Sequence, residues 1–126
     1  MAEVLIADDD VDLADAWRRA LEMDGHTVTV TSSGSAAIDE IKQKSFDVII
    51  TDVIMPGTGG IVVSGMARLF TENTAVIAVS GYLHDIAGRA KLDFLRNIGV
   101  KHVLPKPVDL NELSALVLSL AQRRVG

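Results

Sequence analysis

The sequence predicts an α/β fold in which five strands form a parallel sheet covered by helices. Short runs of strand-favouring residues alternate with helical patterns from one end of the chain to the other, as in repeated strand–helix units. The runs at 47–51 and 75–79 are almost continuously apolar, which is typical of central strands buried on both faces. The length of 126 residues fits one domain, so a single unit over 1–126 is expected.

Apolar and β-branched runs define the strands. We expect them at Val4 to Ala7, Thr27 to Thr31, Asp47 to Thr51, Ala75 to Val79 and Lys101 to Leu104. A helix is expected after each strand, because a parallel sheet needs crossover connections.

The first helix has the clearest pattern. Apolar residues recur along it at helical spacing, with Asp10 as a cap before it and Gly25 beyond its end. This stripe comprises Leu13, Ala16, Trp17, Ala20 and Leu21. The next three helices are expected at about 34–42, near 61–70 and within 83–97. The last helix begins after Asp109, whose spacing to Glu112 resembles a capping box.

The composition excludes several classes of protein. A formal net charge of -5 argues against general nucleic-acid binding, which needs a basic face. The absence of cysteine excludes disulfides, thiolate nucleophiles and cysteine zinc sites, and the three histidines have no ligand spacing and are expected to be structural or solvated. No apolar run is long enough for a membrane span or a signal-peptide core, so we expect a cytoplasmic protein with no membrane partner.

Polar residues stand where four of the predicted strands end. Asp8 and Asp9 follow the first strand, Asp52 the third and Ser80 the fourth, and Lys106 lies just past the fifth. In an open parallel sheet, ligands bind outside the carboxyl ends of the strands, so these side chains are expected to converge there. Each residue taken singly has an ordinary explanation as a helix cap or solvated turn. Their joint placement favours a site.

Three crowded carboxylates repel one another unless their pKa values rise or a cation lies between them. Mg²⁺ suits this need because it prefers hard oxygen ligands and is commonly held by carboxylates together with phosphate oxygens. A carboxylate can also attack a phosphoryl group to give an acyl phosphate. An ammonium group and a hydroxyl group nearby would stabilise the phosphoryl oxygens as charge develops on them.

These residues resemble the receiver domain of two-component response regulators over essentially the whole chain. The matching segments are 4–10 (VLIADDD), 51–57 (TDVIMPG) with Gly60, Ser80-Gly81 and 105–107 (PKP). The resemblance implies a doubly wound, flavodoxin-like fold with five helices and the strand order 2-1-3-4-5. It also implies a cis bond between Lys106 and Pro107.

The resemblance implies a role for each site residue. Asp52 would be the phosphoacceptor, while Ser80 and Lys106 would bind the phosphoryl group. The metal ligands for Mg²⁺ would be Asp8, Asp9, Asp52 and the backbone carbonyl of Ile54. Such domains take a phosphoryl group from a histidine kinase or histidine phosphotransfer protein and hydrolyse it slowly themselves, so no enzymatic activity beyond this is expected. The output would be contact with a downstream protein, and homodimerisation on phosphorylation stays open.

The chain departs from the family pattern in two places. Val103 stands where an aromatic switch residue is usual, and Tyr82 is an alternative aromatic reporter. The stretch from Ser80 to Lys106 is a few residues longer than usual, so the segment 86–96 is either an altered partner surface or a longer amphipathic helix with a solvated basic face. The apolar and aromatic flanks provided by Ile54 and Tyr82 favour a long-lived phosphoryl form.

Three other classes of protein compete with this interpretation. A pseudo-receiver would keep the fold as an interaction domain without phosphorylation, and Val103 keeps that alternative open. A small aspartyl phosphatase usually carries a second Asp where this chain has Ile54. A nucleotide-binding flavodoxin-like protein would need a glycine-rich phosphate loop after the first strand, and the sequence has none there.

Overall fold

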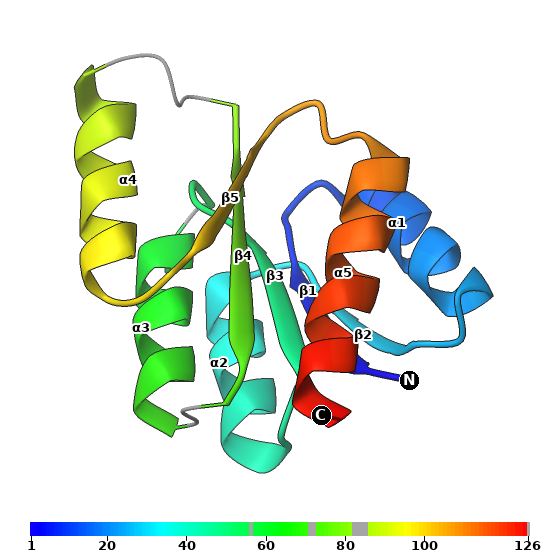
Figure 1. Ribbon diagram of the computed structural model, residues 1–126. Helices are drawn as coiled ribbons and strands as arrows, with labels where there is room; N and C mark the ends of the chain where they lie inside the picture. The colour runs from blue at the N-terminus through cyan, green and yellow to red at the C-terminus, as the bar shows by residue number, and fades with distance from the viewer. Residues whose placement is uncertain (56, 71–72, 82–85, 126) are drawn as a thin grey trace.

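A computed structural model describes residues 1–55, 57–70, 73–81 and 86–125 of the chain. Five parallel strands form one sheet in the order β2-β1-β3-β4-β5, which confirms the predicted order (Figure 1). The strands are β1 (Glu3–Ala7), β2 (Thr27–Thr31), β3 (Val48–Asp52), β4 (Ala75–Ser80) and β5 (His102–Pro105). The helices are α1 (Val11–Met23), α2 (Gly34–Gln43), α3 (Gly60–Phe70), α4 (Ile86–Asn97) and α5 (Leu110–Val125).

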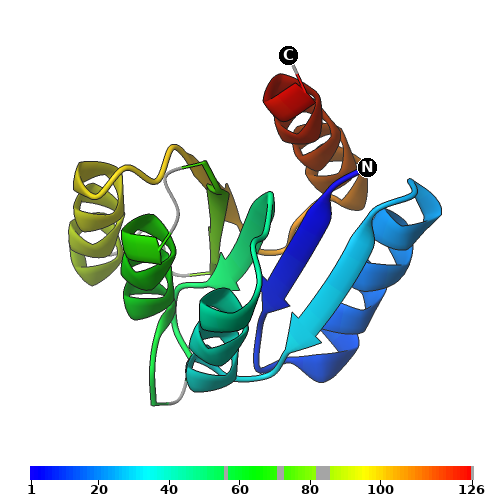
Figure 2. The same ribbon diagram turned by 90° about the horizontal axis from the view of Figure 1, so that it is seen from below.

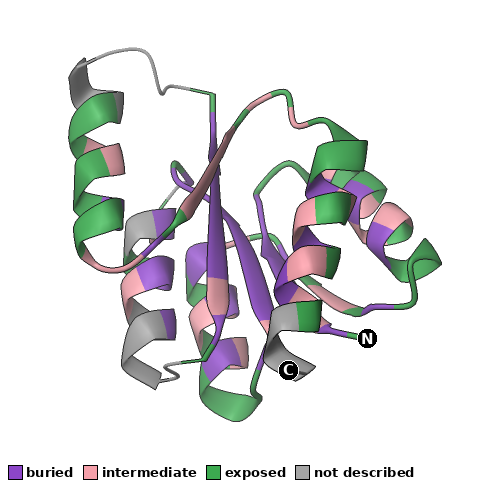
Figure 3. Ribbon diagram, viewed as in Figure 1, coloured by how far each residue is buried: buried purple, intermediate pink, exposed green. Residues whose placement is uncertain are grey.

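The helices form a layer on each face of the sheet. Seen along the sheet, α1 and α5 lie on one side, and α2, α3 and α4 lie on the other (Figure 2). Two apolar clusters fill the spaces between these layers and the sheet. The strands β1, β3 and β4 are buried along almost their whole length, which confirms the prediction for β3 and β4 (Figure 3). Trp17 is buried in the cluster under α1 and α5, which confirms its expected place in the core.

Side-chain caps begin three of the helices, and two of these caps, Asp10 and Asp109, are at the predicted residues. The side chain of Asp10 accepts a hydrogen bond from the backbone N–H of Leu13, and Ser33 Oγ accepts one from Ala36. Asp109 Oδ1 accepts hydrogen bonds from the backbone of Asn111 and Glu112. These bonds satisfy N–H groups that have no partner within the helix, so they fix where each helix starts.

Three of the observed strands end one residue later than predicted. Asp52 is the last residue of β3, Ser80 is the last of β4, and β5 continues to Pro105. The shift arises because strand pairing extends past the apolar runs: Asp52 pairs with Val79, and Ser80 pairs with Pro105. The polar residues therefore belong to the ends of the paired strands themselves.

No helix in the described ranges has the length and apolar character that spanning a membrane would require. Residues 83–85 of the predicted fourth helix, which include His84, lie outside the described residues, and so does Tyr82.

A close backbone contact supports the end of β3. A Cβ atom added at Gly60 would lie 2.0 Å from the carbonyl oxygen of Asp52, well inside van der Waals contact. Only glycine allows the start of α3 to approach the strand this closely. Gly65, one helical turn later, has open space within 4 Å of the same added atom.

We therefore expect Gly60→Ala and Gly65→Ala to have opposite effects on stability. Gly60→Ala should lower the free energy of unfolding by about 2–3 kcal/mol, the upper part of the usual range, because backbone must shift. Gly65→Ala should raise it by up to about 1 kcal/mol, the difference in helix propensity. Urea denaturation of both variants measures these changes. Equal stability of the two variants would contradict the close contact.

Candidate functional site

The predicted carboxylates converge at the carboxyl end of the sheet. Asp8 follows β1 and is fully buried, Asp52 ends β3 and is 6% exposed, and Asp9 is exposed beside them. One carboxylate oxygen from each of the three residues lies within 4.8 Å of the others. Since β1 and β3 are neighbours in the sheet, their register alone brings Asp8 and Asp52 together.

Lys106 joins the two buried carboxylates. Its Nζ lies 3.0 Å from Asp8 Oδ2 and 3.0 Å from Asp52 Oδ2, so one ammonium group contacts both. Burial alone would lower the pKa of Lys106, but the hydrogen bonds with Asp52 and Asp8 outweigh it and raise that pKa. Lys106 is therefore a cation throughout the physiological pH range.

The backbone around Lys106 places its side chain. The bond between Lys106 and Pro107 is cis, as the resemblance implied. The backbone N–H of Lys106 donates to the carbonyl oxygen of Ser80 over 3.0 Å, which continues the pairing of β4 with β5. Ser80 is itself buried at the end of β4, and the residue before it, Val79, pairs with Asp52. The structure thus brings Ser80 to the same end of the sheet as the carboxylates.

Asp8 is the most constrained of the acidic groups. Burial raises its pKa above the ordinary 3.8, while the backbone N–H of Asp10, which donates to Asp8 Oδ1, and the Lys106 ammonium partly oppose that shift. The neighbouring charge of Asp52 adds to the increase. Ionised Asp8 is therefore held in place at a cost in stability.

Two contacts orient Asp52. The backbone N–H of Ile54 donates to Asp52 Oδ1 over 3.3 Å, and Lys106 holds Oδ2. The side chain of Ile54 is 40% exposed, so an apolar group borders the site on its solvent side. The proposed role of the Ile54 carbonyl as a metal ligand stays a prediction.

The sequence did not reveal two supports of Asp52. The hydroxyl group of Thr51 donates to the carbonyl oxygen of Asp52 over 3.0 Å, and Gly60 packs against the same oxygen. Both residues lie in the segments that carry the family resemblance, but the sequence alone did not indicate that either one supports Asp52.

The donor set fits a magnesium ion. Three carboxylates share one ammonium group, which leaves two negative charges uncompensated when all the carboxylates are ionised. All of the offered side-chain ligands are hard oxygen atoms, and Asp9 is open to solvent, so a hydrated ion has access. The residues present therefore suit Mg²⁺.

A family profile described as the response regulator receiver domain matches residues 4–118. The chain belongs to this family. Receiver domains are the signal-receiving parts of two-component response regulators, and the match spans the site and nearly the whole fold.

Known proteins similar to this receiver domain include longer regulators. The response regulator PmrA of Pseudomonas aeruginosa is 32% identical over 126 residues, which cover 98% of this chain and 54% of PmrA. The transcription factor SKN7 of Saccharomyces cerevisiae is 26% identical over 122 residues, which cover 97% of this chain and 19% of SKN7. The chain thus spans about half of one relative and a fifth of the other.

Solved structures agree with the fold of this receiver domain. The receiver domain of the Francisella response regulator 1452 is 32% identical, with a TM-score of 0.86 over 98% of this chain and 99% of that one. The response regulator TrrA of Thermotoga maritima, solved in complex with Mg²⁺ and beryllium fluoride, is 22% identical, with a TM-score of 0.81 over 95% of this chain and 99% of that one. At this low identity, TrrA supports the fold alone.

Val103 stands where the family resemblance implied an aromatic residue. Val103 is half-buried and packs against the apolar cluster under α2, α3 and α4, whereas its neighbour Leu104 packs against the opposite cluster. Position 103 therefore carries a small apolar side chain on the face of β5 that packs toward the layer of α2, α3 and α4. Tyr82, the alternative aromatic reporter, lies outside the described residues.

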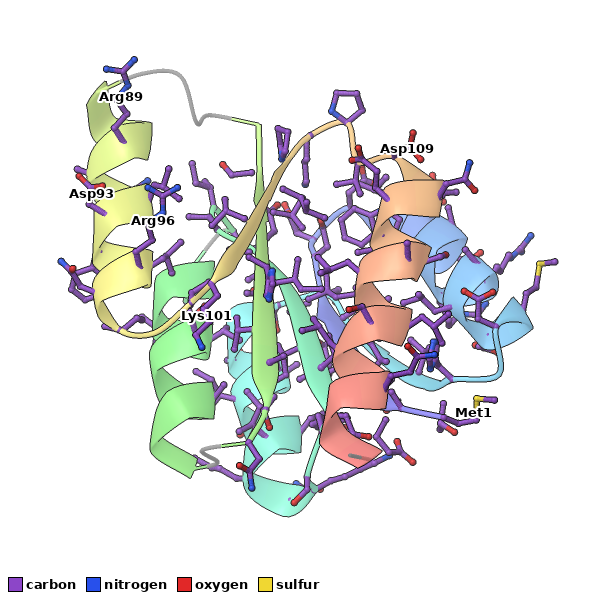
Figure 4. The ribbon with its side chains drawn as sticks, viewed as in Figure 1. Met1, Arg89, Asp93, Arg96, Lys101 and Asp109 are labelled. Atoms are coloured by element: carbon purple, nitrogen blue, oxygen red, sulfur yellow. The ribbon has the colours of Figure 1, made fainter. Side chains whose placement is uncertain are left out.

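The surface of α4 has the amphipathic character that both interpretations of 86–96 predicted. Arg89, Asp93 and Arg96 project from the helix, and Lys101 follows it (Figure 4). Phe94 is half-exposed, and Leu95 is buried.

We expect Asp8→Asn to stabilise the metal-free protein near pH 7. The substitution removes a buried charge with a raised pKa and leaves Lys106 paired with Asp52. The free energy of unfolding should rise by roughly 0.5–2 kcal/mol, the range of common stabilising substitutions. Thermal and urea unfolding with a chelator present measure the change, and Asp39→Asn, at an exposed position on α2, is the matched control.

The stabilisation by Asp8→Asn should depend on pH in a defined direction. Because the folded-state pKa is raised, folded protein binds the proton on Asp8 more tightly than unfolded protein does. The cost of the charge is thus present in full above the folded pKa, and it disappears as pH falls through that pKa to below 3.8. The advantage of Asp8→Asn should shrink over the same range. A variant less stable than wild type near pH 7 would contradict this account.

Proposed function

We propose that this receiver domain is a phosphorylation-dependent switch in which Asp52 accepts a phosphoryl group with Mg²⁺ bound. The observation that carries the proposal is the placement of Lys106 Nζ 3.0 Å from both Asp52 Oδ2 and Asp8 Oδ2. An ammonium group held against the acceptor carboxylate is positioned to contact oxygen atoms of an incoming phosphoryl group.

Different residues of the site would carry out different parts of the phosphoryl transfer. A carboxylate oxygen of Asp52 attacks phosphorus and forms an acyl phosphate bond. The bond between phosphorus and the nitrogen of the donor phosphohistidine breaks, which leaves a free imidazole on the donor. Ile54 N–H fixes the orientation of the attacking carboxylate. Lys106 and the hydroxyl group of Ser80 would hold the phosphoryl oxygens.

Asp8, Asp9 and Asp52, with the carbonyl of Ile54, would hold the metal ion. When bound, Mg²⁺ supplies positive charge that offsets both the carboxylates and the phosphoryl oxygens. Asp9 is exposed whereas Asp8 and Asp52 are buried, so Asp9 is the most exposed of the three carboxylates. TrrA, which shares the fold, was solved in complex with Mg²⁺ and beryllium fluoride.

The donor in this proposal is a histidine kinase or a histidine phosphotransfer protein. Receiver domains of response regulators interact with such proteins, and PmrA, a relative of this chain, is named a response regulator. We propose that no separate substrate is turned over: water returns Asp52 to the free carboxylate in a slow self-catalysed step. The functional output is then a change in affinity for a downstream protein.

We expect a small acyl-phosphate donor to add one phosphoryl group to the wild-type protein, as measured by intact mass. The addition should require Mg²⁺ and should be abolished in Asp52→Asn, because the nucleophile is lost. Asp39→Asn, which changes an exposed carboxylate on α2, should be modified like wild type. No mass increment in folded wild-type protein with Mg²⁺ would contradict the proposal and favour the pseudo-receiver. An increment that survives in Asp52→Asn would assign the acceptor elsewhere.

A further inference from the structure

His26 fastens the start of the first strand to the corner between α1 and β2. The ring is 4% exposed, and its Nδ1 accepts a hydrogen bond of 3.1 Å from the backbone N–H of Ala2. The carbonyl oxygen of Ala2 in turn accepts a bond of 3.0 Å from the backbone N–H of Thr27. Ala2 is buried in the apolar cluster under α1 and α5. His26 and Thr27 thus form hydrogen bonds with both polar backbone groups of Ala2, its N–H and its carbonyl oxygen.

The hydrogen bond from Ala2 defines the protonation state of the ring. A backbone N–H only donates, so Nδ1 must be without a proton, and the neutral ring carries its proton on Nε2. Nε2 is buried and has no hydrogen-bond partner among the described residues. In the imidazolium form both ring nitrogens donate, and the Nδ1 proton would face the Ala2 N–H across 3.1 Å. The observed arrangement therefore excludes a proton on Nδ1.

Charged groups of both signs lie near the His26 ring. The carboxylate of Asp24, at the end of α1, favours the imidazolium form, and the amino group of Met1 opposes it. The carboxylate of Glu22 lines the same cavity of about 320 Å³ as His26 and is paired with Arg18. Burial has the largest effect and lowers the pKa of His26 below 6.5.

We propose that His26 is an acid-sensitive latch. The neutral ring holds Ala2 and the amino end of β1 against the α1–β2 corner, and protonation of Nδ1 removes the acceptor and releases them. The latch does not rest on the phosphorylation chemistry, because it lies at the opposite end of the sheet. Ala2 precedes Asp8 by six residues of extended chain, roughly 20 Å. Met1 and Asp109 mark these two ends in Figure 4.

The sign of the pH dependence follows from the burial of the ring. Because folded protein binds the proton on His26 more weakly than unfolded protein does, acid favours unfolding. This loss of stability begins as pH falls through 6.5, grows until pH reaches the folded pKa, and stays constant below it.

NMR on the unmodified protein tests the latch directly. The ring of His26 is titrated through its own resonances, while hydrogen-exchange protection factors are measured at the amides of Ala2, Thr27 and Leu5. We expect protection at Ala2 and Thr27 to fall by about five- to tenfold as the ring titrates, the factor for one lost hydrogen bond. Leu5, in the buried part of β1, should lose protection only as far as the global free energy of unfolding, measured by urea denaturation at the same pH, decreases. A ring that titrates with no change at Ala2 and Thr27, or one that stays neutral until the protein unfolds, would overturn the proposal.

Two substitutions provide matched controls. His26→Asn places an oxygen acceptor near the position of Nδ1 without a titrating group, so protection at Ala2 should persist and should no longer depend on pH. His102→Asn removes a half-buried histidine on β5 and should leave the acid response intact. Loss of protection with acid in His26→Asn, to the same extent as in wild type, would assign the response to another group.

Discussion

The Lys106 ammonium group lies between two carboxylates that come from different strands, and the geometry of the site depends on this arrangement. Asp8 follows β1, Asp52 ends β3, and Lys106 follows β5, so the full strand order is needed to bring the three together. One positive charge cannot balance Asp8, Asp9 and Asp52. The site thus carries excess negative charge when all three carboxylates are ionised, and its hard oxygen ligands suit a divalent cation such as Mg²⁺.

Much of the fold and of the site could be predicted from the sequence, because both depend on patterns along the chain. Apolar runs located the strands, and a general rule about parallel sheets placed Asp8, Asp52 and Lys106 at one edge. The contacts themselves could not be predicted from the sequence, because they depend on strand register and on side-chain direction. Examples are the bridge from Lys106 to two carboxylates and the packing of Gly60 against the Asp52 carbonyl. Strand ends were displaced by one residue because pairing, which is a tertiary property, carried β3 and β4 into polar residues.

The two ends of the sheet hold buried polar groups in different ways. At the carboxyl end, buried carboxylates face an ammonium group, and burial raises the pKa of Asp8. At the amino end, a neutral histidine accepts a backbone hydrogen bond, and burial lowers its pKa. The sequence indicated the first site through four strand ends, whereas His26 has no pattern that distinguishes it from an ordinary core residue. Only the position of the Ala2 N–H reveals its role.

We propose above all that the three carboxylates form a metal site whose excess negative charge is offset by Mg²⁺. Thermal unfolding measured across a series of Mg²⁺ concentrations tests it most directly, with Asp9→Asn as the variant, because Asp9 is exposed and its loss should not disturb packing. The account predicts that Mg²⁺ stabilises wild-type protein by about 2.7 kcal/mol at a hundredfold excess over its dissociation constant, and stabilises Asp9→Asn much less at the same concentration. No stabilisation of wild type, or equal stabilisation of both proteins, would contradict it.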